Sequence, residues 1–107
     1  MNRVEVLKEA EKQITGHREH DYGTPESNFE LVSAYWTLYK GIEFSAHDVA
    51  MMMALLKVAR IQNGGGSGDS HVDLVGYGAL AGELYSAEEN ISAETKENIY
   101  ESKGEKE

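Results

Sequence analysis

Residues 49–77 read VAMMMALLKVARIQNGGGSGDSHVDLVGY, and this stretch decides the fold. An apolar segment stands on each side of a glycine-rich run, which is typical of two helices joined by a short flexible connection. Four charged residues stand within the apolar segments, near the ends that face the connection: Lys57, Arg60, Asp69 and Asp73. Because an unpaired buried charge is strongly unfavourable, we expect these side chains to be paired, hydrogen-bonded or bound to a metal.

Helical patterns extend over the rest of the chain. Apolar spacing and capping residues predict helices near residues 3–15, 25–40, 46–63 and 70–86. Thr24 and Pro25 have the order of an N-cap followed by proline at the first helical position, and Ser45 to Asp48 fits a capping box. The helix at 46–63 is apolar nearly all round, which predicts a central buried helix. No alternating pattern is long enough for a sheet, so we predict an all-α bundle of four or five helices.

The length of 107 residues fits one domain. We place a single helical domain at 1–86 and an acidic C-terminal extension at 87–107, partly helical and then disordered. Only 8% of the residues are aromatic, so the core is thin. A thin core and an all-round apolar helix predict further burial between chains, in a homo-oligomer.

Composition narrows the range of partners. The formal net charge is −9, with 19 acidic and 10 basic residues, which argues against duplex nucleic acid. The absence of cysteine excludes disulfides and thiolate metal sites. The longest apolar run, 49–56, is far shorter than the ~20 residues of a transmembrane helix, so we expect a soluble, cytoplasmic protein with no membrane partner.

Two carboxylates form the first candidate site. Asp69 and Asp73 are four residues apart, so on a helix they share one face and suit a hard cation such as Mg²⁺. Helix capping is the alternative, either by Asp69 itself or by Ser70 and Asp73 as a capping box. Both interpretations stay open on the sequence alone.

Basic residues form the second candidate site. Lys57 and Arg60 lie three residues apart near the end of the long helix, where they suit a phosphate clamp, complement the helix dipole, or pair directly with Asp69 and Asp73. Arg18 and Tyr22 belong to a polar segment that suits either a nucleotide-binding loop or a solvated connection.

An ordered set of short motifs extends over roughly residues 17–85: DYG at 21–23, NF at 28–29, VAxM at 49–52, LKxAR at 56–60, DSxxD at 69–73 and GY at 76–77. In this order they resemble an often phage-encoded domain of unknown function. That family is distantly similar to the MazG-like all-α nucleoside triphosphate pyrophosphohydrolases, in which E-x-x-E and E-x-x-D on successive helices hold Mg²⁺. The resemblance implies a MazG-like bundle with Mg²⁺ as cofactor and Asp73 in place of the final aspartate. Ser70 stands at the glutamate position of E-x-x-D, and Lys57-x-x-Arg60 replaces E-x-x-E.

Two functions follow. The first is a phage-type nucleotide-binding protein, with Mg²⁺-dependent pyrophosphohydrolysis as its reaction. In it Asp69 and Asp73 hold the metal, and the basic residues with Arg18 and Tyr22 contact the nucleotide. Additional carboxylates would come from Glu26, Glu30 or Asp48. The second is a non-enzymatic, homo-oligomeric helical module with a structural Lys/Arg–Asp network and an acidic exterior that binds a protein partner. A further carboxylate facing Asp69 and Asp73 would favour the first function.

Overall fold

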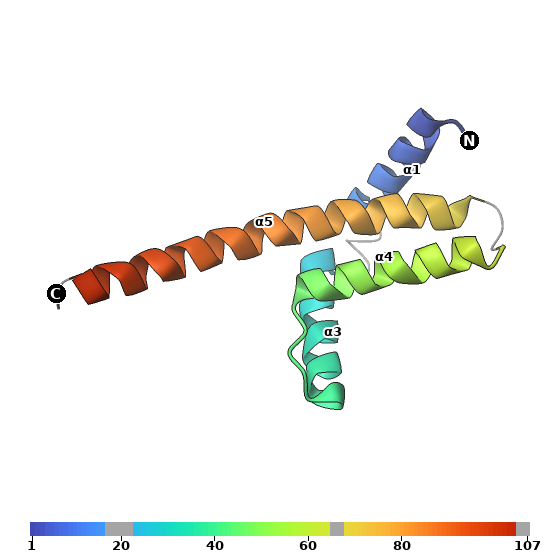
Figure 1. The fold of residues 1–107 in the computed structure, drawn as a ribbon. Helices are drawn as coiled ribbons and strands as arrows, with labels where there is room; N and C mark the ends of the chain where they lie inside the picture. Colours follow the sequence, from blue (N-terminus) through green and yellow to red (C-terminus); the bar gives the residue numbers. More distant parts are fainter. Residues whose placement is uncertain (17–22, 65–67, 105–107) are drawn as a thin grey trace.

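The computed structural model describes residues 1–16, 23–64 and 68–104, with side chains through residue 87, and its regular structure is entirely helical. The helices are α1 (Arg3–Thr15), α3 (Pro25–Lys40), α4 (Ala46–Gln62) and α5 (Asp69–Gly104). Figure 1 shows α4 and α5 running antiparallel, with α1 against α5 and α3 projecting from the start of α4. The predicted all-α fold is confirmed over the described part of the chain.

The helix ends follow the capping residues in the sequence. The Thr24 side chain accepts a hydrogen bond from the backbone N–H of Ser27 at 3.1 Å, and Pro25 begins α3 as predicted. Ser45 and Asp48 form the full capping box of α4, with bonds of 3.0 and 2.9 Å. These bonds satisfy N–H groups that have no partner within the helix. The expected helix boundaries are therefore confirmed at these ends.

Helix α5 is longer than the sequence suggested. It runs for 36 residues to Gly104, past the end that we predicted near residue 86. The Ser86 hydroxyl donates to the carbonyl of Gly82 at 3.1 Å inside the helix, so it does not cap a new one. No proline follows, and alanine, glutamate and lysine favour helix there. The predicted boundary at 86/87 thus falls inside α5. Residues 105–107, at the end of the extension that we expected to become disordered, lie outside the described residues.

Small residues let α4 and α5 pack closely. Ala50 on α4 is fully buried against Ala81 and Leu84 of α5, with Phe29 of α3 packed on the same cluster. The antiparallel register also brings the rings of His47 and Tyr85 within 5.5 Å. Since short side chains allow close approach of two backbones, the core of this molecule is a narrow seam rather than a broad layer.

The side of α4 that faces away from α5 is exposed, which differs from the prediction. Met51, Met52, Leu55, Leu56 and Val58 are 40–62% exposed, although the sequence predicted a central buried helix. The prediction is wrong for this side, because α5 covers one side of α4 and α3 covers its beginning. Among the described helices, none combines the length and apolar character that a transmembrane span requires.

Two glycines of α5 offer a matched test of the α1–α5 contact. A Cβ at Gly76 would lie 3.2 Å from Ile14 Cγ2, whereas one at Gly78 would meet nothing within 4 Å. Gly76→Leu should therefore lower the free energy of unfolding by about 1–3 kcal/mol through overpacking. Gly78→Ala should raise it by about 0.5–1 kcal/mol through helix propensity. Urea unfolding followed by circular dichroism measures both, and equal tolerance of the two changes would contradict this packing.

Candidate functional site

One ion pair crosses the α4–α5 seam. Lys57 Nζ lies 3.0 Å from Asp73 Oδ2, and the two side chains are only 14% and 28% exposed. The antiparallel register places the end of α4 beside the start of α5, so a residue late in one helix meets a residue early in the other. Of the interpretations left open by the sequence, direct pairing is therefore present for Lys57 and Asp73.

The capping interpretation fails for Ser70 and Asp73. The carbonyl of Gly68 accepts from the N–H groups of His71 and Val72 at 3.0 and 3.1 Å, so Gly68 holds the N-cap position and Ser70 is buried inside the helix. Asp69 is exposed in the first turn of α5, and Arg60 is exposed in the last turn of α4. Each charge complements its helix dipole there.

The additional carboxylates do not gather around Asp73. Asp48 accepts the N–H of Ser45 at the other end of α4, nine residues before Lys57 and hence about 13 Å away along the helix axis. Glu26 is half-buried in the first turn of α3, and Glu30 is exposed. Over the described ranges, no three acidic or histidine side chains are grouped so that they could hold a metal ion. The donor set therefore does not fit a Mg²⁺ ion held by protein side chains alone.

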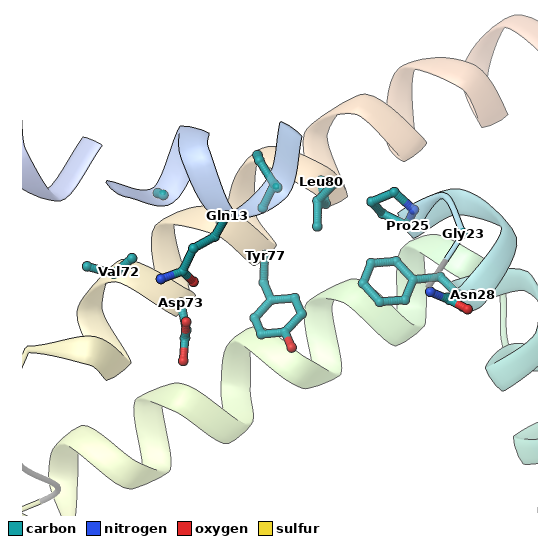
Figure 2. A pocket seen from close by; sticks show the side chains of 12 residues that line it. Gln13, Gly23, Pro25, Asn28, Val72, Asp73, Tyr77 and Leu80 are labelled. Atoms are coloured by element: carbon teal, nitrogen blue, oxygen red, sulfur yellow. The ribbon is translucent and has the colours of Figure 1, made fainter. Parts of the chain in front are cut away.

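A cavity of about 140 Å³ lies between α1, α3 and α5. Figure 2 shows side chains from all three helices around it. Its lining is made of Ala10, Gln13 and Ile14 on α1, Gly23, Pro25, Asn28 and Phe29 at the start of α3, and Val72, Asp73, Gly76, Tyr77 and Leu80 on α5. Asp73 thus belongs both to the ion pair and to the wall of the cavity.

The cavity combines an aromatic wall with a few polar groups. The rings of Phe29 and Tyr77 lie 6.2 Å apart at 35°. Asp73 offers carboxylate oxygens, and Gln13 and Asn28 offer amides that donate and accept. The Gln13 amide donates to Glu9, one turn earlier on the same face of α1, at 3.3 Å. An apolar pocket with a few convergent polar groups is typical of small-molecule sites.

Sequence reasoning found only part of this site. Phe29, Asn28 and Tyr77 belong to the motif set, but no role in a pocket was inferred for them. Gln13 gave no signal, because a polar residue on an amphipathic helix is ordinary. Arg18 and Tyr22, expected to contact the nucleotide, lie outside the described residues.

Comparison with known proteins places the chain in a family. The family model for the domain of unknown function DUF6378 matches residues 5–85. The chain belongs to this family. The DUF6378 match includes every residue of the cavity and both partners of the ion pair, whereas the last turns of α5 lie beyond it.

Two phage proteins are similar to the chain. The Gene 55 protein of Mycobacterium phage L5 is 42% identical over 78 residues, which is 72% of this chain and 50% of that protein. The Gene 55 protein of Mycobacterium phage D29 is 35% identical over 92 residues, 86% of this chain and 60% of that protein. The chain thus spans half to three-fifths of the length of these relatives. No solved structure matches it, so the similarity to MazG-like enzymes stays a prediction.

A double-mutant cycle tests the ion pair. Asp73→Asn leaves a largely covered ammonium group without its counter-charge and should lower the free energy of unfolding by about 1–3 kcal/mol. Lys57→Met keeps the apolar stem and removes the charge. The double variant should be less destabilised than the sum of the single variants, by about 0.5–2 kcal/mol. Urea unfolding gives all four values, and strict additivity would show that the pair makes no energetic contact.

Proposed function

We propose that the chain binds a nucleotide and that the cavity between α1, α3 and α5 takes the base. The observation that carries the proposal is the convergence of two aromatic rings and three polar side chains, from three helices, on one cavity of about 140 Å³. Sites for drug-sized ligands usually have volumes of ~300–1,000 Å³. The cavity therefore suits a compact planar group, with the remainder of the ligand outside.

The lining supplies both kinds of contact that a base needs. Phe29 and Tyr77 offer ring faces, and stacking on an aromatic ring is favourable for any base. The amides of Gln13 and Asn28 are able to match donor and acceptor pairs. Stacking would give affinity and the polar edge would give selectivity.

Basic residues of α4 support a phosphate-bearing ligand. Lys57 pairs with Asp73, a residue of the cavity wall, and Arg60 lies three residues further along α4, exposed to solvent. In this proposal Arg60 and Arg18 contact the phosphates, since guanidinium groups suit phosphate oxygens. Lys57 holds the Asp73 carboxylate in position, and Tyr22 is a further nucleotide contact in this proposal.

Hydrolysis of a nucleoside triphosphate is the reaction that we propose to test. Water would add at the α-phosphorus, the α–β anhydride bond would break, and the products would be a nucleoside monophosphate and pyrophosphate. Mg²⁺ commonly binds one or two carboxylates together with substrate phosphates, so Asp69 and Asp73 are its candidate protein ligands. Because the described side chains do not form a metal site by themselves, binding is to be tested both with and without Mg²⁺.

A second candidate function is the non-enzymatic helical module. The Lys57–Asp73 pair favours it, because the pair explains both charges without a ligand. In this proposal the chain is a homo-oligomer whose acidic exterior binds a protein partner. Nucleotide titrations distinguish the two functions, since the module predicts no response to any nucleotide.

Calorimetric titration with a panel of ribo- and deoxyribonucleoside triphosphates tests the first proposal, and analysis for pyrophosphate then tests turnover. Phe29→Leu keeps an apolar side chain but removes the ring, so binding should weaken about tenfold, or ~1.4 kcal/mol. Tyr85→Leu is the matched control, because it removes an exposed ring of α5 outside the cavity and should leave affinity unchanged. The proposed site would be rejected if Phe29→Leu and Tyr85→Leu weakened nucleotide binding equally. It would also be rejected if no binding were measured at ~1 mM nucleotide.

A further inference from the structure

Helix α3 carries an apolar face that the chain itself leaves uncovered. Leu31, Tyr35 and Leu38 follow at spacings of four and three residues, so they line one side of the helix, and Ile42 comes directly after the Gly41 cap that ends it. They are 58–82% exposed, and α3 has no fully buried residue. Figure 1 shows α3 projecting away from the α4–α5 pair. A single helix of this length is marginal in water without tertiary packing along an apolar face.

Helix α4 carries a second uncovered face. Its exposed apolar residues, from Met51 to Val58, occupy the half of the helix that points away from α5. No charged side chain interrupts the run from residue 49 to residue 56. A helix that is apolar on all sides is normally buried on all sides. In the chain alone, α4 meets this condition on one side only.

We infer that a second copy of this chain covers both faces. The α3 face of each copy, formed by Leu31, Tyr35, Leu38 and Ile42, packs on the outer α4 face of the other copy. Two identical contacts related by a twofold axis then form a closed dimer. One such arrangement covers four apolar faces at once.

The exposed apolar area supports a second copy as the occupant. The nine large side chains of the two faces are 40–82% exposed. At roughly 150–200 Å² for a large side chain, they offer about 700–1,000 Å² on each copy, close to the ~800 Å² per partner of a stable interface.

Two charge-introducing variants test the arrangement in the full chain. Leu38→Lys changes the α3 face and Leu55→Glu changes the α4 face, at side chains that are 82% and 62% exposed and so contribute little to folding of the single chain. Analytical ultracentrifugation should show a dimer for the parent chain at micromolar concentration. For each variant alone, the dissociation constant of the dimer should rise at least about tenfold, because both contacts of the dimer then place a charge against an apolar face.

Mixing the two variants tests which face meets which. In a mixed dimer, one contact brings the introduced lysine beside the introduced glutamate, and the other keeps both leucines. Native mass spectrometry should therefore show a mixed dimer in a solution where neither variant dimerises alone. If α3 packed on α3 and α4 on α4, each contact of a mixed dimer would place one introduced charge against an unchanged apolar face. Mixing the two variants would then not restore dimerisation.

Matched controls are Ala79→Lys and Ala87→Glu, which make the same charge changes at exposed positions of α5 and should leave the dimer intact. Circular dichroism confirms that each variant is folded, and Tyr35→Lys and Met51→Glu serve as replacements if either is not. The inference would be overturned if the parent chain were a monomer or if either single variant still formed a dimer. It would also be overturned if the control variants dissociated or if the mixture of the two variants stayed monomeric.

Discussion

Close antiparallel packing of α4 against α5 is the constraint on which the other contacts depend. Ala50 and Ala81 meet in the seam, and their short side chains let the two backbones approach. This contact fixes the register of the helices, and with it the pairing of Lys57 with Asp73. Helix α1 then packs on α5 and α3 on α4, so both rely on the same seam for their position.

We expect the ion pair to contribute more to the register of the two helices than to net stability. Bringing two charges into a partly covered position costs hydration, which offsets much of their attraction. A slip of one helical turn, about 5.4 Å, would separate Lys57 from Asp73 and leave both charges in poorly hydrated positions. The correct register is thus favoured because the alternatives are penalised, while the apolar seam supplies most of the attraction between the helices.

Local features were predictable because they depend on neighbours in sequence. The caps at Thr24 and Ser45 and the periodicity of the first four helical segments give their elements directly. The continuation of α5 past Ser86 was missed, since a serine that bonds back to the preceding turn has the same sequence pattern as a capping serine. The all-α class was therefore accessible from the sequence, but the exact extent of α5 was not.

The candidate site was less predictable because it joins three helices. Asp73 and Lys57 were recognisable as charges in apolar segments, and their pairing follows from a hairpin. Gln13 and Phe29 reach the same cavity only through the way α1 and α3 pack, which no local pattern reports. The prediction for the exposed side of α4 failed for the same reason. Apolar character predicts that a helix is buried, but it does not indicate which element covers it.

Helix α3 has two different surroundings along its length. Its first turns, with Asn28 and Phe29, form a wall of the cavity, and its later turns present an apolar face to solvent. If a ligand binds in the cavity, it fixes the beginning of this rigid helix and so also restricts the orientation of its end. If the chain also associates through α3, thermodynamic linkage makes the two effects mutual. Ligand binding then changes the association constant by the same factor by which association changes the affinity of the cavity.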